Sequence, residues 1–432
     1  MPYTNEEMLE SLRKLLRIPS VSCHGATPRQ PYGTEVDEAL DHTLALCRSL
    51  GMRTTKLPGK TAWAEIGQGT EMIAVVPHLD VVPAGDGWTV EPFVGTIKDG
   101  RLYGRGSSDN KGPAMSCIYA AADILEETGG RLPRRLRLIL GQSEETGVWT
   151  DMDYYRQNEE KPIAGFTPDA EFPALNGEKG MLWAELAVPA AKSGLQSLKG
   201  GTACNIVAAQ CEACYKNHDG QPVRLSAAGK AAHATVPDQG VSAIAVVMRE
   251  LYGRVEDPLV AFHEKYVRDT CHGEYMGIDI TDEASGRTTL CVGMVSTTPE
   301  EITMTLDIRY PVTADGEGIL KKVQDAAADC GVELRILKNA KPLYYPKDHP
   351  VLQQVLAAYR EETGDQGDPI VIGGGTYARG IDNIVGFGAA FPGHIHTEHQ
   401  NDEYVELADF YLQRKIYHNA MLRLLNMELP TL

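Results

Sequence analysis

Two short apolar runs, each followed by polar residues, constrain the fold of this 432-residue chain more than any other feature. Residues 71–77 (EMIAVVP) and 136–140 (LRLIL) have the length and the bounding turn residues of buried strands. Residues 114–127, which lie between them, have apolar positions at helical spacing, as do 5–16 and 36–50. Strands that alternate with helices predict an α/β fold, with a mostly parallel sheet that helices cover.

The pattern changes in the middle of the chain. Runs such as LWAELAV and TTLCVGMVS are typical of strands, and 242–252 among them is typical of a helix. After the proline-containing segment PLYYPKDHP, the pattern returns to helix, turn, strand and a final helix. We therefore predict an α+β domain at 182–340, inserted into a first domain that 1–181 and 341–432 form.

Charge and cysteine usage exclude several classes of protein. The net charge of −18 repels nucleic acid and anionic membrane surfaces, so we expect neither as a partner. No apolar run is long enough to cross a bilayer, and the first residues lack the basic-then-apolar order of a signal peptide. Nine cysteines without framework spacing indicate reduced thiols and a cytoplasmic protein. We interpret Cys211 and Cys214, a C-x-x-C pair, as packing residues, because no second pair follows at zinc-site spacing.

Candidate site residues follow the predicted strands directly. His78 and Asp80 come after the first strand, and residues two apart in an extended chain point to the same face. Glu144 and Glu145 come after the second strand, where two buried acids without partners would be costly. An exposed polar loop is the alternative for these two acids. Open α/β sheets hold their active sites at the carboxyl ends of strands, so we expect one site there.

Further candidate ligands lie in loops. The glycine-rich turn 104–112 (GRGSSDNKG) matches neither the dinucleotide fingerprint nor the P-loop, so Asp109 within it is a candidate metal ligand instead. Asp169 is another acid of this kind. Three histidines near the C-terminus offer nitrogen ligands, and spacing alone does not choose among them: His394, His396 and His399. A set of His, Asp and Glu without Cys favours a catalytic pair of zinc, manganese or cobalt ions.

Eight ordered blocks of the chain resemble the PepV-type dipeptidases, relatives of carnosinases, aminoacylases and succinyl-diaminopimelate desuccinylases. The blocks are HLDVVPAGDGW (78–88), GRGSSDNKGP (104–113), SEETG (143–147), FTPDAEFP (166–173), GKAAHATVPDQG (229–240), DIRYP (307–311), IGGGTYAR (372–379) and HTEHQNDE (396–403). The resemblance implies hydrolysis of the amide bond of dipeptides by a water that two divalent ions activate. Zinc is the expected metal, and manganese or cobalt are the alternatives.

The resemblance also implies a role for each matching residue around the ions. The metal ligands are His78, Asp109 as the carboxylate that both ions share, Glu145, Asp169 and His399. Asp80 bonds the outer nitrogen of His78 and so fixes its tautomer. Glu144 is the general base that takes a proton from the water and passes it to the leaving amine.

The inserted domain resembles the lid of that family. His233 matches the residue that stabilises the oxyanion, and Asn205 matches a lid asparagine near the substrate. Arg309 matches the arginine that holds the free carboxylate of the substrate, a task that suits its planar fork. Gly374 and Gly375 match the positions where backbone amides approach the substrate closely.

Two residues depart from the resembled pattern: Asn110 stands where an Asp is frequent, and His396 where an acid is expected. The resemblance also implies a cis peptide bond between Asp109 and Asn110. The length of the inserted domain favours a monomer, whereas shorter relatives form dimers, so a monomer and a homodimer both stay open. The alternative function is deacylation of N-acyl amino acids or N-succinyl-diaminopimelate. A metal-binding protein without catalysis is disfavoured, because the chain retains Glu144.

Overall fold

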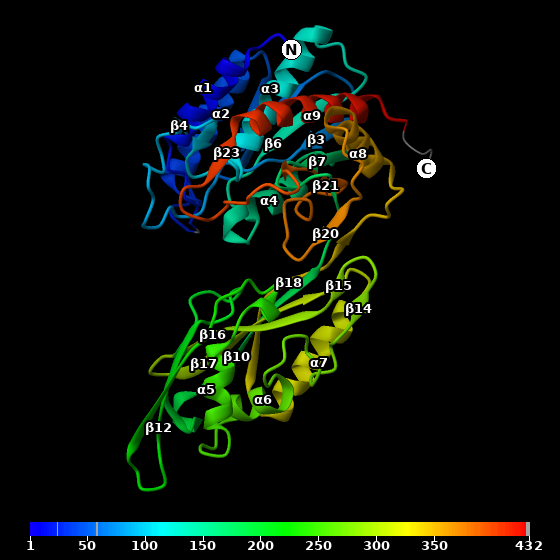
Figure 1. The fold of residues 1–432 in the computed structure, drawn as a ribbon. Coiled ribbons are helices and arrows are strands. Elements are labelled where there is room, and N and C mark those ends of the chain that lie inside the picture. The colour runs from blue at the N-terminus through cyan, green and yellow to red at the C-terminus, as the bar shows by residue number, and fades with distance from the viewer. Residues whose placement is uncertain (24, 58, 429–432) are drawn as a thin grey trace. The chain divides into compact units, whose positions relative to one another are not determined.

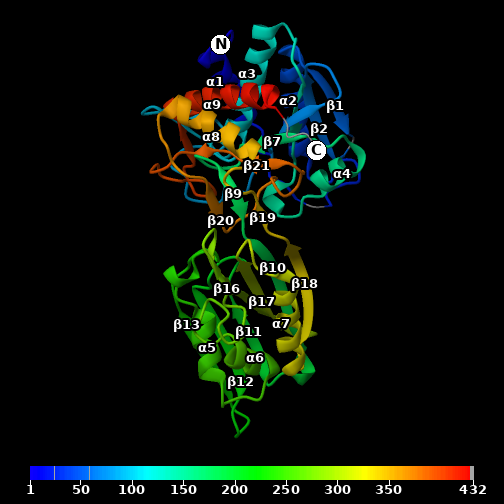
Figure 2. The ribbon, with the colours of Figure 1, turned by 90° about the vertical axis from the view of Figure 1, so that its right-hand side faces the viewer.

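A computed structural model of the protein describes residues 1–23, 25–57 and 59–428, and divides the chain into two compact units. Unit 1 comprises Met1–Asn176, Tyr345–Ile370 and Gly375–Leu432, and unit 2 comprises Gly177–Tyr344 and Val371–Gly374. These units differ by a few residues from the ranges expected from the sequence, and unit 2 includes one short segment from late in the chain. Figure 1 shows the elements of each unit along the chain, and Figure 2 shows them from a second side.

The large sheet has the strand order β1-β2-β6-β3-β7-β21-β9-β19, and β20 also pairs with β9. Its strands are β1 (Arg53–Leu57), β2 (Thr61–Ile66), β6 (Arg135–Leu140), β3 (Met72–Val75), β7 (Ala164–Thr167), β21 (Ile384–Gly386), β9 (Leu175–Glu178), β19 (Leu343–Tyr344) and β20 (Ile370–Ile372). The pairs β6/β3, β3/β7 and β7/β21 are parallel, whereas β1/β2, β2/β6, β21/β9 and β9/β19 are antiparallel. The predicted parallel sheet is therefore confirmed at its centre, and both ends are antiparallel.

Helices cover this sheet. Those of unit 1 are α1 (Asn5–Leu16), α2 (Thr34–Ser49), α3 (Lys111–Thr128), α4 (Thr150–Asn158), α8 (Pro350–Thr363) and α9 (Leu407–Asn426), with the single turn η1 (Glu144–Thr146). The helices predicted at 5–16, 36–50 and 114–127 are confirmed as α1, α2 and α3. Helix α9 contacts both α3 and α8, and Figure 1 shows it in red.

Strand β6 shows why both faces of the sheet are covered. Successive side chains of a strand point to opposite faces, and Leu136, Leu138 and Leu140 belong to the main core with residues of α3 and α9. Arg137 points to the other face, where it donates hydrogen bonds to Tyr155 of α4 (3.0 Å) and to Glu65 of β2 (2.8 Å). One face is therefore apolar, and a buried polar network joins the other face to α4.

Two small sheets place loops near the carboxyl ends of the parallel strands. The three-stranded sheet β23-β5-β4 joins β23 (Tyr404–Glu406) to β5 (Arg101–Tyr103) and β4 (Thr96–Lys98). The strands β8 (Ala170–Glu171) and β22 (Ala389–Ala390) form a short parallel pair. These pairings bring segments from late in the chain next to the glycine-rich turn and next to the end of β7.

Unit 2 consists of a seven-stranded antiparallel sheet, a separate antiparallel pair of strands (β14 and β15), and three α-helices. The sheet order is β13-β12-β11-β16-β17-β10-β18. The elements of unit 2, in chain order, are β10 (Gly180–Pro189), η2 (Ala190–Lys192), β11 (Leu195–Gly200), β12 (Gln210–Lys216), β13 (Pro222–Ala228), η3 (Pro237–Gln239), α5 (Ala243–Leu251), α6 (Pro258–Tyr266), β14 (Thr281–Asp282), β15 (Gly286–Arg287), β16 (Thr289–Thr297), β17 (Glu301–Tyr310), α7 (Gly316–Asp329) and β18 (Glu333–Ala340). The α+β character predicted for this region is confirmed (Figure 2).

Successive side chains of β17 point to opposite faces of the sheet, and only those on one face pack against the helices. Ile302, Met304, Leu306, Ile308 and Tyr310 belong to one apolar cluster with residues of α5, α6 and α7. The residues between them point to the other face of the sheet. Asp307 and Arg309 are two apart on that face, and they form a buried ion pair there.

Among the described residues, no helix has the length and apolarity needed to cross a membrane. The described cysteines are free thiols, and Cys211 of the C-x-x-C pair lies in the apolar cluster of unit 2. Burial raises the pKa of Cys211 to about 12, so its thiol stays protonated near neutral pH.

We expect the ion pair between α3 and α9 to be a main stabilising contact of unit 1. Arg414 donates to both carboxylate oxygens of Asp123, at 2.7 and 2.8 Å, and both side chains are almost fully buried. Asp123→Ala leaves the buried Arg414 cation without a carboxylate partner, although the backbone oxygen of Tyr3 still accepts from it, and should lower the free energy of unfolding by about 3–5 kcal/mol. The midpoint of urea unfolding measures this change.

Asp153→Ala is the matched control, because Asp153 pairs with Arg156 in an exposed position. Exposed pairs contribute little, so this variant should change stability by less than about 0.5–1 kcal/mol. Equal unfolding midpoints for the two variants would contradict the importance of the buried pair.

Candidate active site

Three neighbouring parallel strands end at one edge of the sheet of unit 1, and each is followed by acidic or histidine side chains. His78 and Asp80 follow β3, and Glu144 and Glu145 follow β6. Asp169 follows β7, which was not a predicted strand. His78 prolongs the pairing of β3 and β6 through a parallel bridge with Gly141. The strand ends therefore bring these five side chains to one place, as parallel strands require.

Asp109 lies at the centre of this cluster, in the turn before α3. Its Oδ1 is 3.0 Å from Nε2 of His78, and its Oδ2 is 3.0 Å from Nε2 of His399. His78 Nε2 is also 3.7 Å from Oδ2 of Asp169, and His399 Nε2 is 3.0 Å from Oε2 of Glu145. Each oxygen of Asp109 thus contacts one histidine, and each of these histidines lies near one further carboxylate, so we distinguish two half-sites that share Asp109.

The pKa values of the cluster reflect crowded, buried negative charge. Burial raises the pKa of Glu144 well above its usual range, and the nearby charge of Asp169 adds to this effect. Burial and the charge of Asp109 raise the pKa of Glu145 to about 7. Burial also opposes ionisation of Asp109, but hydrogen bonds from His399 and His78 lower its pKa. Without added positive charge, these carboxylates must share protons.

The cluster fits divalent cations. Two triads have ligand atoms within 4.8 Å of one another: His78, Asp109 and Glu145, and His78, Glu144 and Asp169. Oε1 of Glu145 is buried and has no hydrogen-bond partner among the described residues, so one ligand atom is available. Imidazole nitrogen with carboxylate oxygen is a donor set for zinc, manganese or cobalt.

Asp80 lies behind the cluster and holds two of its parts. Nδ1 of His78 is 3.0 Å from the backbone oxygen of Asp80 and 3.3 Å from Oδ1 of its carboxylate. The same carboxylate accepts hydrogen bonds from the backbone N–H groups of Glu144 (3.2 Å) and Glu145 (3.1 Å). Ser22 donates to it as well, at 2.7 Å. One buried carboxylate therefore orients His78 and fixes the start of η1.

Tyr377 and Asp151 support the same turn, and sequence reasoning missed both. The Tyr377 hydroxyl donates to Asp151 (2.6 Å) and accepts from the backbone N–H of Ser143 (3.1 Å). Its ring packs so closely that a Cβ at Gly141 would lie 2.1 Å from it, so only glycine fits there. Tyr377 lies in the IGGGTYAR block, which was the available signal, whereas no sequence pattern points to Asp151.

Asn110 has a structural use that its sequence position did not reveal. Its Nδ2 donates to the backbone oxygen of Pro168 (2.7 Å), and its Oδ1 accepts from the backbone N–H of His78 (3.3 Å). An ionised Asp could not donate to Pro168, so the amide suits this position. The peptide bond between Asp109 and Asn110 is cis, as the resemblance implied.

The structure separates the three C-terminal histidines. His399 joins the acidic cluster, whereas Nδ1 of His394 is 2.7 Å from the carboxylate of Asp409, away from the other ligands. His396 lines a cavity of about 150 Å³ beside Asp109 and Asp169. This cavity therefore borders the acidic cluster.

In unit 2, His233 and Asn205 lie together on the surface. Nε2 of His233 is 3.5 Å from Nδ2 of Asn205, and Nδ1 is 2.8 Å from the hydroxyl of Thr235. The chain pairs at this point through a bridge between Ile206 and His233. The two predicted substrate residues therefore share one place, although they are 28 positions apart.

Arg309 is buried and already has a carboxylate partner. Its guanidinium binds both oxygens of Asp307 and donates to the backbone oxygen of Gly373 at 2.9 Å. Its proposed contact with a substrate carboxylate stays a prediction.

The turn at Gly373 and Gly374 is crowded at only one of these glycines. A Cβ at Gly373 would lie 2.5 Å from Cγ2 of Thr235, whereas the atom nearest to a Cβ at Gly374 is 3.7 Å away. The roles of Gly374 and Gly375 also stay predictions.

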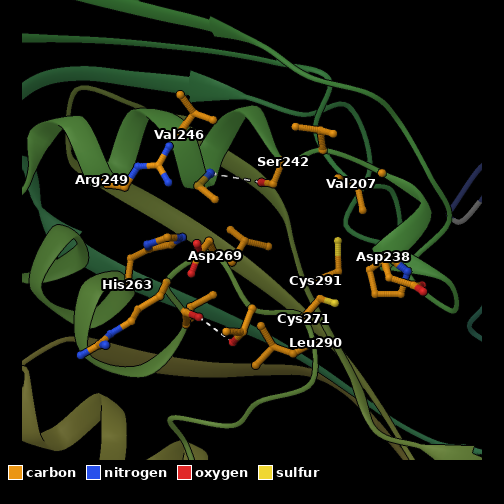
Figure 3. Close-up of a pocket in the computed structure, with 18 residues that line it drawn as sticks. Val207, Asp238, Ser242, Val246, Arg249, His263, Asp269, Cys271, Leu290 and Cys291 are labelled. Carbon is orange, nitrogen blue, oxygen red and sulfur yellow. Dashed lines mark hydrogen bonds between the residues drawn. The ribbon is translucent and has the colours of Figure 1, made fainter.

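A larger cavity, about 470 Å³, lies within unit 2, and no predicted site residue lines it (Figure 3). Burial lowers the pKa of His263, which faces it, to about 4, so this imidazole is neutral. Burial raises the pKa of Cys291 in the same wall to about 12, so its thiol is a poor nucleophile. Size alone would therefore favour this cavity as the active site, but the chemistry of the lining side chains favours the smaller cavity beside Asp109.

A family model and several known proteins match this chain over most of its length. The description "Peptidase family M20/M25/M40" belongs to a family model that matches residues 74–423. A protein of Bacillus subtilis (strain 168) named "Putative dipeptidase YtjP" is 34% identical over 458 aligned residues, which cover 97% of each chain. Human carnosine dipeptidase 1 has a similar structure, with a TM-score of 0.66, 16% identity, and coverage of 98% of this chain and 97% of that chain. The di-peptidase Dug1p of Saccharomyces cerevisiae has a TM-score of 0.62 at 15% identity, with coverage of 98% and 96%.

We expect metal binding to distinguish His399 from His394. Metal-depleted protein titrated with zinc or manganese should bind two ions per chain. His399→Ala removes the histidine of one half-site, so at least one ion should bind about tenfold more weakly or be lost. Competition with a chromophoric chelator measures the affinity, and metal analysis after gel filtration gives the stoichiometry.

His394→Ala is the matched control, because His394 pairs with Asp409 outside the cluster. This variant should bind both ions as the unchanged protein does. Equal losses in both variants would mean that His399 is not the ligand.

Proposed function

The chain belongs to the peptidase family M20/M25/M40, and we propose that within this family it is a metal-dependent dipeptidase. The family model describes peptidases, and the relatives from Bacillus subtilis and Staphylococcus saprophyticus, each aligned over 97% of its length, carry the name "Putative dipeptidase". The observation that carries the proposal is the position of Asp109 between His78 and His399, which forms two half-sites around one carboxylate.

The proposed ligands divide between the two half-sites. His78 and Asp169 would hold one ion, Glu145 and His399 would hold the other, and Asp109 would bind both. Two such ions, zinc in the first place and manganese or cobalt as alternatives, would lower the pKa of a bound water and polarise the substrate carbonyl. Asp80 keeps the Nε2 atom of His78 directed at the cluster through its contacts with Nδ1.

Glu144 is the proposed general base. Its backbone is held by Asp80, and its carboxylate lies with His78 and Asp169 in one triad. The carboxylate takes a proton from the attacking water and then gives it to the nitrogen of the leaving amine, so Glu144 returns to its starting form. Its neighbour Glu145 lies 3.0 Å from His399, which supports a different role for Glu145, as a ligand.

The residues of unit 2 have proposed roles towards the substrate. Because Thr235 engages Nδ1 of His233, we assign Nε2 of His233 to the oxyanion that forms on the substrate carbonyl. Asn205, beside this nitrogen, is a second substrate contact. Arg309 remains the candidate for the free carboxylate of the dipeptide, with the backbone amides of Gly374 and Gly375 as further contacts.

The proposed substrate is a small dipeptide, with no nucleic-acid or membrane partner, and the protein acts as a monomer or a homodimer. We propose a cytoplasmic location, which the free cysteines support, because oxidising compartments favour disulfides.

A substrate panel tests the proposed function. Metal-depleted protein, restored with zinc, manganese or cobalt, is incubated with free dipeptides, dipeptides with an amidated C-terminus, and N-acyl amino acids. Cleavage of free dipeptides that needs metal and falls on amidation supports a dipeptidase with a carboxylate contact. Turnover of N-acyl amino acids without cleavage of dipeptides would transfer the assignment to the deacylases.

We expect two variants of adjacent acids to have different effects. Glu144→Gln removes the base and should lower kcat by about 10²–10⁴-fold while both ions stay bound. Glu145→Gln removes a ligand atom and should lower metal affinity as well as kcat. Steady-state kinetics on a cleaved dipeptide, together with metal analysis of each variant, measures both effects; loss of metal from Glu144→Gln would contradict its assignment as the base.

A further inference from the structure

Glu403 is a fully buried carboxylate four residues after His399, and nothing in the proposed chemistry uses it. We propose that Glu403 is a positioning residue: it fixes the backbone of Asp109 and thereby aims the carboxylate that both half-sites share. The inference rests on the proposed function, since it concerns the same metal site. It assigns a role to a residue that touches neither substrate nor ion.

Glu403 accepts hydrogen bonds from three residues of the glycine-rich turn, Gly106, Ser108 and Asp109. Its Oε1 accepts from the backbone N–H groups of Ser108 (2.9 Å) and Asp109 (3.1 Å) and from the Ser108 hydroxyl (3.0 Å). The N–H of Gly106 lies 3.0–3.1 Å from both oxygens. Gly106 has φ of +90°, a conformation that favours glycine, and it turns this N–H inward. One carboxylate therefore determines the path of the chain into Asp109.

Arg105 completes the arrangement with a positive charge. Its Nη1 is 2.6 Å from Oε2 of Glu403, and both side chains are about 1% exposed. The guanidinium also lies over the ring of Trp88, 5.2 Å from its centre. Without Glu403, the backbone N–H groups would lose their acceptor and the buried Arg105 cation would lose its carboxylate partner, so the present path of the turn would be disfavoured.

The backbone around Glu403 is itself anchored. Strand β23 begins at the next residue and pairs with β5, so that Tyr404 lies opposite Tyr103. The backbone oxygen of Glu403 accepts from the N–H of Gly104 at 2.9 Å, which extends this pairing to the start of the turn. The carboxylate therefore enters the turn from a rigid strand rather than from a loose loop.

His399 is carried by the same segment. The hydroxyl of Thr397 accepts from the backbone N–H of Tyr404 at 3.1 Å and closes a loop that contains both His399 and Glu403. From this loop, His399 contacts Oδ2 of Asp109, and Glu403 contacts the N–H of the same residue. Side chain and backbone of Asp109 are thus held from one closed loop, which sets the distance between the shared carboxylate and His399.

The test compares Glu403→Gln with Glu406→Gln. Both acids belong to the same segment, but Glu406 pairs with Arg101 in a partly exposed position, outside the turn. Glu403→Gln cannot accept at both oxygens, so we expect affinity for zinc or manganese to fall about 10–100-fold, the usual effect of losing a group behind a ligand. Glu406→Gln should bind both ions as the unchanged protein does. Chelator competition without substrate measures the affinities.

Thermal unfolding of the metal-free variants separates positioning from general stability. Weaker metal binding by Glu403→Gln that keeps the unchanged protein's circular dichroism supports the proposal. Unchanged metal affinity, with or without a lower Tm, overturns it. If Glu403→Gln does not fold, Ser108→Ala replaces it: this change removes only one donor to Oε1, and metal affinity should fall about threefold, whereas no change overturns the proposal.

The readout also distinguishes this inference from the proposed function. Two ions bound by the unchanged protein and lost in Glu403→Gln, without cleavage of any dipeptide, would support the positioning role and contradict the dipeptidase assignment. Cleavage of dipeptides, with equal metal affinity in the unchanged protein and in Glu403→Gln, would support the dipeptidase assignment and contradict the positioning role.

Discussion

Several carboxylates must be kept together in a buried place, and the rest of unit 1 depends on this constraint. Like charges at short distance repel strongly when water is excluded, and burial alone already disfavours the ionised form. The structure places Asp109 between two histidines and brings Glu145 against His399. Such an arrangement is costly on its own and becomes favourable when cations enter, which explains why the donor set matters more than the size of the cavity.

Backbone N–H groups also hold the acidic cluster in place, because they donate hydrogen bonds to two buried carboxylates. Asp80 accepts from the first residues of η1, and Glu403 accepts from the turn before α3. In both cases a buried acid that is not a proposed ligand accepts a hydrogen bond from the main chain of a proposed ligand, Glu145 or Asp109. A ligand whose backbone is fixed from behind loses little freedom when an ion binds, so preorganisation supports metal affinity.

In unit 2, the alternation of side chains between the two faces of a strand determines which residues pack in the core and which are free of it. The apolar residues of β17 pack on the helices, and the same alternation places Asp307 and Arg309 on the opposite face. This pair also explains the turn at Gly373, because the guanidinium donates to its backbone oxygen. Thr235 then links this turn to His233, so a small set of side chains connects the residues to which substrate contacts were assigned.

The sequence by itself determined the features that depend on local spacing. The helices α1, α2 and α3, the strands β3 and β6, and the juxtaposition of His78 with Asp80 all follow from periodicity over a few residues. The strand ends also indicated where acids would gather, since parallel strands finish at one edge. Strand β7 was not predicted, because AGFT is too short and too mixed in character for periodicity to detect.

Only the tertiary structure decided the contacts between distant segments. The choice of His399 over His394 depends on the pairing of β23 with β5, and the partner of Ser143 is Tyr377, 234 positions away. The support that Glu403 gives to Asp109 spans 294 positions. Local patterns carry no information on such contacts, because chain topology and close packing, not the neighbours in sequence, determine which side chains meet.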